Sequence, residues 1–139
     1  MFRMETRRTR LIVVSGSHKE VGKTRLIEKL LPFLGKAAAV KISSQPAHSP
    51  VEERPDSDSS RYRAAGAAEA LYIHGSDTGS LQPLRDMLDS NEFDTVCCET
   101  NRFSDMIDAD LRFFVRGKGE PKDNAASCEA RADIIIEGA

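Results

Sequence analysis

The stretch SGSHKEVGKT, residues 15–24, follows the apolar run LIVV and contains residue types that suit the binding of a phosphate group. Gly16 and Gly22 allow main-chain torsions, and a close approach to an oxyanion, that a side chain would prevent. Successive amide groups and the N-terminus of a following helix would then surround the phosphates. Lys23 is placed to reach the terminal phosphates of a nucleotide, and the hydroxyl of Thr24 to hold Mg²⁺.

The predicted nucleotide-binding loop departs from the strict pattern G-x-x-x-x-G-K-[ST] at one position. Serine stands at position 17, where the first glycine is expected, and Gly16 comes one residue earlier. A chance GKT at an ordinary helix start is the simpler alternative. An apolar strand before the loop and a helical pattern after it nevertheless supply the context that the motif requires. The residues predicted to contact the nucleotide are Gly16, Ser17, His18, Lys19, Glu20, Val21, Gly22, Lys23 and Thr24.

Short apolar runs that alternate with helical patterns predict the elements that position this loop. Strands are expected at 10–14, 37–42, 70–74, 94–99, 110–116 and 133–138, and helices at 23–34, 59–70, 81–90 and 124–132. Pro32 should kink or loosen the end of the first helix. The run AAGAA, residues 64–68, is interpreted as a helix face that packs closely against the sheet through Gly66. The alternation predicts an α/β fold, with one domain over residues 1–139 and a three-layer, doubly wound, mostly parallel sheet. The loop at residues 15–24 within this fold leads us to expect the P-loop NTPase type.

Charged residues near the ends of the predicted strands are candidates for further chemistry, because ligands bind beyond the carboxyl ends of parallel strands. Glu99 is expected to ligate the metal or hold a metal-bound water, or else to face solvent as a strand end. Lys41 is expected to stabilise charge on a phosphoryl group, or else to be a surface lysine. Asp58, with Asp56 nearby, is a helix N-cap or a metal ligand. The predicted catalytic residues are therefore Lys23 and Lys41, and the predicted metal-binding residues are Thr24, Glu99 and Asp58.

Composition argues against several classes of function. The 139 residues are 40% apolar and 30% charged with a net charge of -2, which gives no argument for a nucleic-acid or membrane surface. No apolar stretch has the length of a membrane span or a signal-peptide core, so a cytoplasmic protein is expected. Cys97 and Cys98, inside TVCCE, are expected to be small buried hydrophobes. The segment 43–58, rich in Ser and Pro, is expected to form a long functional or mobile loop.

The loop resembles that of dethiobiotin synthetase and its amidoligase relatives, which carry the form G-x-x-x-E-V-G-K-T. Those families have an acidic residue five positions before the lysine, and related ATPases have a second lysine there, whereas this sequence has His18. The resemblance implies phosphoryl transfer to a small molecule, with Lys41 in the place of a lysine that contacts transferred phosphate or substrate. The resemblance implies no role for His18. The matching residues are Gly16, Glu20, Val21, Gly22, Lys23 and Thr24.

A second resemblance covers most of residues 10–101. DSSRYRAAGAAEAL, residues 58–71, resembles the D-S-x-R-x-R-x-A-G-A segment of the MobB family, with one extra serine. These are GTP-binding accessory proteins of molybdopterin guanine dinucleotide synthesis. The resemblance implies a metal-site glutamate at Glu99, an aspartate opening the second helix at Asp58, and paired arginines at Arg61 and Arg63, of which at most one faces the site. It also implies a homodimer, and proteins of the molybdopterin pathway as partners.

The His-rich stretch that often follows the lysine in the MobB family is missing here, where only His48 stands. The sequence as a whole predicts Mg²⁺-dependent binding and slow hydrolysis of GTP or ATP, in an accessory role in molybdopterin guanine dinucleotide synthesis. Two alternatives stay open: small-molecule phosphoryl transfer like that of the synthetase, and nucleotide binding without turnover. Asn101 and Arg102 follow the strand that ends at Glu99 and are placed to touch substrate or base, although solvent exposure is the simpler expectation for Arg102.

Overall fold

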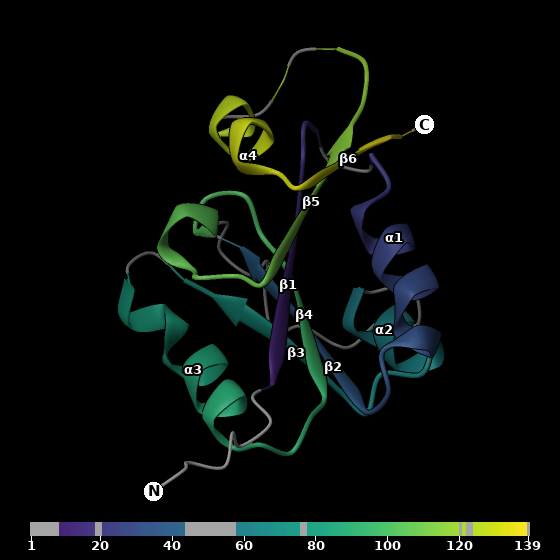
Figure 1. Ribbon diagram of the computed structural model, residues 1–139, viewed down its shortest axis with the longest axis vertical. Helices are drawn as coiled ribbons and strands as arrows, with labels where there is room; N and C mark the ends of the chain where they lie inside the picture. The colour runs from purple at the N-terminus through teal and green to yellow at the C-terminus, as the bar shows by residue number, and fades with distance from the viewer. Residues whose placement is uncertain are drawn as a thin grey trace, which may run out of the picture.

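The computed structural model describes residues 9–18, 21–43, 58–75, 78–119, 121 and 124–138, and its strands form one sheet in the order β3-β2-β4-β1-β5-β6 (Figure 1). Every pair of neighbouring strands is parallel. The strands are β1 (Arg10–Gly16), β2 (Ala37–Ser43), β3 (Glu69–His74), β4 (Thr95–Glu99), β5 (Leu111–Arg116) and β6 (Ile134–Glu137). The α-helices are α1 (Lys23–Leu30), α2 (Asp58–Ala64), α3 (Gln82–Asp89) and α4 (Ala125–Arg131), and the 3₁₀ turns are η1 (Leu31–Phe33), η2 (Thr78–Leu81) and η3 (Ser104–Met106). The predicted α/β fold is confirmed.

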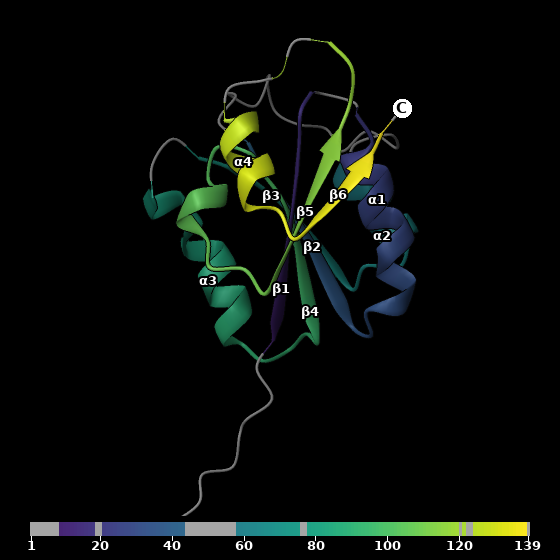
Figure 2. The same ribbon diagram turned by 45° about the horizontal axis from the view of Figure 1, so that its top comes forward.

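Helices cover both faces of the sheet, which makes three layers. Figures 1 and 2 show α1 and α2 on one side and α3 and α4 on the other. Successive side chains of a strand point to opposite faces, so Ile12 and Val14 of β1 pack on the side of α1 and α2, while Leu11 and Val13 pack on the side of α3. Because both faces are buried, the central strands read in the sequence as unbroken apolar runs.

The order of the strands determines which carboxyl ends meet. Strand β4 lies between β1 and β2, so Glu99 at its end is in register with Val14 on one side and with Lys41 on the other. The loop after β1 and the candidate residues of β2 and β4 therefore lie at one edge of the sheet. This is the edge at which parallel α/β sheets bind ligands.

Two of the predicted helices end earlier than their sequence patterns suggest. The α-helical part of 23–34 stops at Leu30, and the chain continues as the 3₁₀ turn η1 with Pro32 near its start, which confirms the expected loosening. Helix α2 ends at Ala64, so the predicted range 59–70 is wrong at its C-terminal end. Gly66 has φ 110°, a conformation that favours glycine and stops the helix. An added Cβ at Gly66 would meet nothing within 4 Å, so its predicted close packing against the sheet is also wrong.

A buried arginine holds the segment that follows β4. Arg112, on β5, is 9% exposed and donates to the carbonyl oxygen and the hydroxyl of Ser104 at 2.9 and 2.8 Å. It also donates to the carbonyl oxygen of Ile107. Hydrogen bonds to a charged donor are stronger than those between neutral groups. The guanidinium group therefore fixes η3 and the polypeptide on either side of it against the sheet.

The cysteines are buried free thiols, as the apolar context of TVCCE predicts for two of them. Cys97 and Cys98 are 0% exposed, and Cys128 of α4 packs on Phe114. Burial raises the pKa of the Cys97 thiol to about 12. Burial also raises the pKa of Cys98, to which the charge of Glu99 adds. No helix among the described residues has the length and apolar character needed to cross a bilayer.

We expect the native protein to resist thiol reagents. The thiolate is the reactive species, and burial both suppresses it and blocks access, so labelling by 5,5′-dithiobis(2-nitrobenzoate) should be more than about 100-fold slower in buffer than in guanidinium chloride. Denatured protein should release three equivalents of thionitrobenzoate, one for each cysteine. Fast labelling of one equivalent in the native protein would contradict the burial of all three thiols.

Candidate functional site

The strand and the helix that must flank the phosphate-binding motif are both present. Strand β1 ends at Gly16 and α1 begins at Lys23. Gly22, just before the helix, has φ 115°, which favours glycine, and its carbonyl oxygen accepts the first helical hydrogen bond from Leu26 at 2.9 Å. Within the predicted loop, Lys19 and Glu20 lie outside the described residues. The torsion predicted for a glycine of this loop is therefore confirmed at Gly22.

Gly16 permits a close approach of the lysine side chain. A Cβ on Gly16 would lie 2.8 Å from Cδ of Lys23 and 2.8 Å from Cγ1 of Val21. Lys23 thus lies across the end of β1, and it is only 9% exposed. The space left by the missing side chain brings the Lys23 stem over Gly16, beside the carboxyl ends of the strands.

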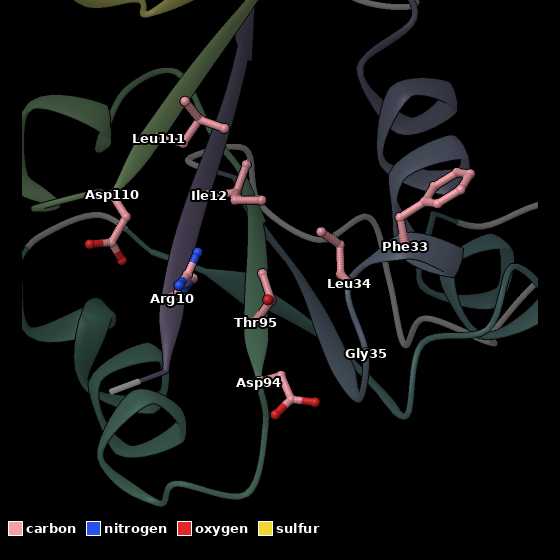
Figure 3. A pocket seen from close by; sticks show the side chains of 9 residues that line it. All are labelled: Arg10, Ile12, Phe33, Leu34, Gly35, Asp94, Thr95, Asp110 and Leu111. Carbon is pink, nitrogen blue, oxygen red and sulfur yellow. The ribbon is translucent and has the colours of Figure 1, made fainter. Parts of the chain in front are cut away.

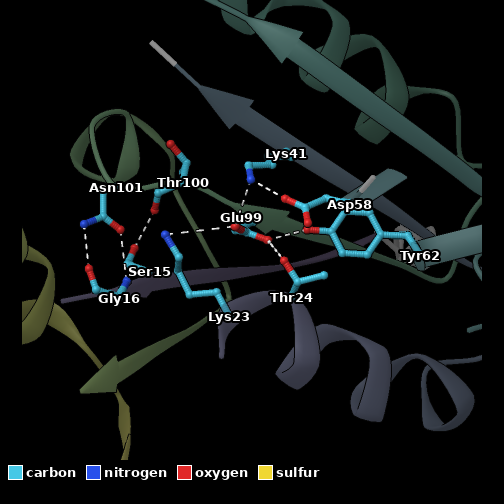
Figure 4. Close-up of polar contacts among 10 residues, drawn as sticks. All are labelled: Ser15, Gly16, Lys23, Thr24, Lys41, Asp58, Tyr62, Glu99, Thr100 and Asn101. Carbon is cyan, nitrogen blue, oxygen red and sulfur yellow. Dashed lines mark hydrogen bonds and ion pairs between the residues drawn. The ribbon is translucent and has the colours of Figure 1, made fainter. Parts of the chain in front are cut away.

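The first two amide groups of the loop are bound within the protein. Gly16 N donates to Oδ1 of Asn101 at 3.0 Å, and Nδ2 of Asn101 donates to the Gly16 carbonyl oxygen at 2.7 Å (Figure 4). Ser17 N donates to the carbonyl oxygen of Val115 at 3.0 Å. Asn101 therefore clamps the end of β1 as a neighbouring strand would. Anion binding by main-chain amides in this loop then rests on the residues after Ser17.

His18 packs beneath the turn that follows β5. Its Nδ1 lies 2.6 Å from the Ser17 hydroxyl oxygen, which also accepts a hydrogen bond from Gly117 N at 2.7 Å. An added Cβ on Gly119 would lie 3.3 Å from Nε2 of His18, so the glycine allows the turn to lie over the ring. Nε2 itself is buried and has no hydrogen-bond partner among the residues that the structure describes. Positions 17 and 18 therefore join the loop to the turn after β5.

Glu99 is the centre of a polar cluster, here called the Glu99 cluster. Its carboxylate is buried, so the solvent-facing alternative is wrong. Oε1 accepts hydrogen bonds from the Thr24 hydroxyl at 2.9 Å and from the Tyr62 hydroxyl at 2.5 Å (Figure 4). Oε2 lies 4.0 Å from Nζ of Lys23 and 3.7 Å from Nζ of Lys41. The members of the cluster are Lys23, Thr24, Lys41, Asp58, Tyr62 and Glu99.

Lys41 joins the two carboxylates of the cluster. It donates a hydrogen bond to Asp58, which lies in the first turn of α2, and it faces Glu99 on the other side. Burial alone would lower the pKa of Lys41, but the charges of Glu99 and Asp58 and the hydrogen bond to Asp58 raise it above its ordinary value. Lys41 is therefore a fixed cation of the site and not a free surface lysine. The described partner of Asp58 is this cation, whereas Thr24 contacts Glu99.

The two arginines of α2 tie the helix to its neighbours. Arg61 makes a two-point ion pair with Glu28 of α1 at 3.1 and 2.5 Å. Arg63 donates to the carbonyl oxygen of Ala70 at 3.1 Å. These contacts tie α2 to α1 and to β3. Arg102 is exposed and lies over the ring of Phe103 at 5.7 Å, as the simpler expectation has it.

The structure gives Asn101 a contact that the sequence does not predict, and it adds Tyr62 to the site. The amide of Asn101 holds Gly16, and no sequence signal marks such a clamp. Tyr62 was not selected at all. A signal for it was present, because residues four apart share a helix face, which places Tyr62 on the same face as Asp58.

The donor set of the cluster fits Mg²⁺. The Thr24 hydroxyl gives its hydrogen to Glu99, which leaves the oxygen lone pairs for a metal ion. Among the described residues, no group of three or more His, Cys, Asp or Glu side chains forms a metal cage. Mg²⁺ commonly binds through one or two protein ligands, with phosphate oxygens and water completing its shell. The arrangement therefore suits a metal ion that arrives with a nucleotide.

Because the phenol of Tyr62 is buried, we expect the free energy of unfolding to fall in alkaline solution. Burial raises its pKa, and the nearby charge of Glu99 raises it further. The folded protein keeps this proton where the unfolded chain loses it, so the contribution of Tyr62 to the free energy of unfolding should be constant below about pH 10 and should fall above it. The buried thiols of Cys97 and Cys98, whose pKa values are also raised, add a fall that begins at about pH 8.5 and that Tyr62→Phe should leave unchanged. Lys41, whose pKa is also raised, adds to the fall above its ordinary value of 10.5. Urea unfolding from about pH 8 to 11 measures the slope, which Tyr62→Phe should reduce. An unchanged slope in that variant would contradict the assignment.

A pocket at the opposite edge of the sheet is separate from this chemistry. It lies at the amino ends of β1, β4 and β5, where Figure 3 shows apolar side chains from the strands and η1 with charged ones beneath them. Its two carboxylates have structural roles, since Asp94 accepts from Lys36 N at 2.9 Å and Asp110 accepts from Leu11 N at 2.8 Å. Parallel strands place these amino ends away from Glu99. The pocket therefore does not contribute to the Glu99 cluster.

No model of a known protein family matches the chain. A search of curated proteins finds no match either.

Proposed function

We propose that the protein binds a nucleoside triphosphate, GTP or ATP, together with Mg²⁺ at the Glu99 cluster, and that it hydrolyses the nucleotide slowly. The observation that carries this proposal is the hydrogen bond from Thr24 to Glu99 beside the Lys23 ammonium group. A hydroxyl at the start of a helix, a strand-end carboxylate and a lysine are the parts that Mg²⁺-nucleotide binding requires. Their meeting at the carboxyl edge of a parallel sheet supports the proposal.

The residues of the cluster have distinct roles in this proposal. Lys23 neutralises the terminal phosphates, and Lys41, across Glu99, supplies a second positive charge to a transferring phosphoryl group. Thr24 and Glu99 would hold Mg²⁺, Thr24 through its hydroxyl oxygen and Glu99 directly or through water. When bound, Mg²⁺ would neutralise charge on the phosphate oxygens. Asp58 keeps Lys41 in place, so that this ammonium group is positioned before the nucleotide arrives.

The biological role that we propose is an accessory one in molybdopterin guanine dinucleotide synthesis, as in the MobB family, carried out with pathway proteins and in a homodimer. Its support is the resemblance of residues 58–71, which include both Asp58 and the two arginines of α2. A second candidate is phosphoryl transfer to a small molecule, as in dethiobiotin synthetase. It is favoured by the position of Lys41, whose side chain is 31% exposed beside Glu99 and so could meet a transferred group. Binding without turnover is the third possibility.

Calorimetric titration with ATP and with GTP, each with Mg²⁺ and with EDTA, tests the binding proposal. We expect one nucleotide to bind in the micromolar range with Mg²⁺ and more weakly without it. Absence of binding of either nucleotide at millimolar concentration would overturn the proposal. Phosphate release then separates the candidate roles. Slow release that a molybdopterin-pathway protein stimulates favours the accessory role, and release that depends on an added small acceptor favours phosphoryl transfer.

A further inference from the structure

The Tyr62 hydroxyl makes a contact that the packing of its ring does not require. Tyr62 is 0% exposed, and its ring belongs to the apolar cluster between the sheet, α1 and α2 that also contains Val14 and Ile27. A phenylalanine would fill the same apolar space. The hydroxyl nevertheless reaches a charged group, because it donates to Oε1 of Glu99 at 2.5 Å. Its contribution is therefore directed at the carboxylate of the candidate metal site.

The hydroxyl helps to fix the plane of the Glu99 carboxylate. The terminal torsion of a glutamate is broad and weakly restrained by itself. Here Oε1 accepts two hydrogen bonds, from Thr24 and Tyr62, while the lysine ammonium groups lie toward Oε2. Figure 4 shows Thr24 and Tyr62 approaching Glu99 from α1 and α2 respectively. Without the phenol, a single hydroxyl would hold Oε1, and the carboxylate would be freer to rotate toward the lysines.

We propose that Tyr62 is a positioning residue of the metal site, which orients Glu99 so that Thr24 presents its hydroxyl oxygen to Mg²⁺. This role rests on the proposed function. The tyrosine donates to Glu99 and does not itself contact the nucleotide or the metal ion. It also joins α2 to the site, because Tyr62 and Asp58 of this short helix both bond to charged groups of the Glu99 cluster.

Tyr62→Phe tests the proposal, with Tyr72→Phe as the matched control. Tyr72, on β3, is 40% exposed and is the only other tyrosine of the chain. One hydrogen bond to a charged group corresponds to about a tenfold effect or more. In the Tyr62 variant the Mg²⁺ concentration that gives half-maximal nucleotide binding should therefore rise about tenfold. Binding in EDTA should change much less than binding with Mg²⁺, because the phosphate loop is intact. The Tyr72 variant should match the wild type in both measurements.

A spectroscopic measurement tests the same contact without altering Tyr62. The chain has no tryptophan, so the Tyr72→Phe protein reports Tyr62 alone by its tyrosine emission. Mg²⁺ with tripolyphosphate, which does not absorb in this range, serves as the probe. We expect the emission to change on binding, because the carboxylate that accepts the phenolic hydrogen becomes engaged with the metal. Adding Glu99→Gln to this protein should abolish the change.

The possible results separate the positioning role from the proposed function. If the wild type shows no Mg²⁺-dependent binding, the proposed function fails, and the role of Tyr62 with it. If the wild type shows that dependence and Tyr62→Phe retains it unaltered, the function stands and the positioning role is overturned. Should Tyr62→Phe fail to fold, the emission measurement decides, since a silent Tyr62 in a protein that binds Mg²⁺ and tripolyphosphate would overturn the role.

Discussion

Lys23→Ala should weaken the binding of Mg²⁺-nucleotide by about 100-fold, while the protein stays folded. Two charge-assisted contacts to terminal phosphates are worth about 3 kcal/mol, which corresponds to that factor. The fold should tolerate the change because Glu99 keeps the Lys41 ammonium group as a neighbour at 3.7 Å, and alanine suits the start of a helix. Calorimetric titration measures the affinity, and circular dichroism with thermal unfolding measures the fold.

Lys29→Ala is the control for Lys23→Ala. Lys29 lies on the same helix, in its last turn, and is exposed. The substitution Lys29→Ala removes the same charge from α1 without touching the Glu99 cluster. The affinity of this variant for nucleotide should therefore stay within about twofold of the wild type. Equal losses in both variants would show that the nucleotide responds only to the overall charge of the protein. Unchanged binding in Lys23→Ala would remove the phosphate loop from the mechanism.

Glu99→Gln should change nucleotide binding in opposite directions with and without metal. The amide keeps the size of the side chain but removes the charge that a metal ion needs, so Mg²⁺-nucleotide should bind about tenfold or more weakly. In EDTA the same variant should bind nucleotide more tightly than the wild type. The lost carboxylate no longer repels the phosphates or competes for Lys23 and Lys41, which lie 4.0 and 3.7 Å from it.

Simple damage to the fold would weaken nucleotide binding both with Mg²⁺ and in EDTA. Opposite changes in affinity under the two conditions would therefore point to the charge of Glu99. Glu28→Gln is the matched control. Glu28 is also a glutamate paired with a cation, Arg61, and it lies on the helix that carries Thr24, but it is outside the Glu99 cluster. Its titrations with Mg²⁺ and with EDTA should both follow the wild type. Weaker binding of Glu99→Gln in both solutions would contradict its assignment to the metal.

The sequence contained most of the information that places the central residues. Alternation of apolar strands and helical patterns predicts a parallel sheet, and parallel strands bring their carboxyl ends to one edge. Lys41 and Glu99, each near the end of its strand, could therefore be expected near the loop after β1, and the structure places them in register. The sequence pattern does not specify the strand order β3-β2-β4-β1-β5-β6, because it depends on which edges pair in three dimensions.

The remaining features depend on tertiary contacts that local patterns do not encode. The end of α2 is set by a single glycine with positive φ, whereas the run AAGAA has high helix propensity apart from that residue. The contact between Tyr62 and Glu99 requires α2 to pack beside the end of β4, a placement that no periodicity specifies. The clamp of Asn101 on Gly16 likewise depends on the path of the chain after β4, which the buried Arg112 holds.

The balance of charge within the Glu99 cluster has a consequence for what the site rejects. Two ammonium groups face two carboxylates, Glu99 and Asp58, so the cluster carries little net charge before any ligand arrives. A small anion such as sulfate or free phosphate, coming without a cation, meets lysines that are already neutralised and a carboxylate that repels it. An anion accompanied by a divalent ion meets a partner for each of its charges. If the proposed function holds, the protein would thus discriminate against abundant simple anions by its own internal counterions, with no need for a barrier that excludes them by size.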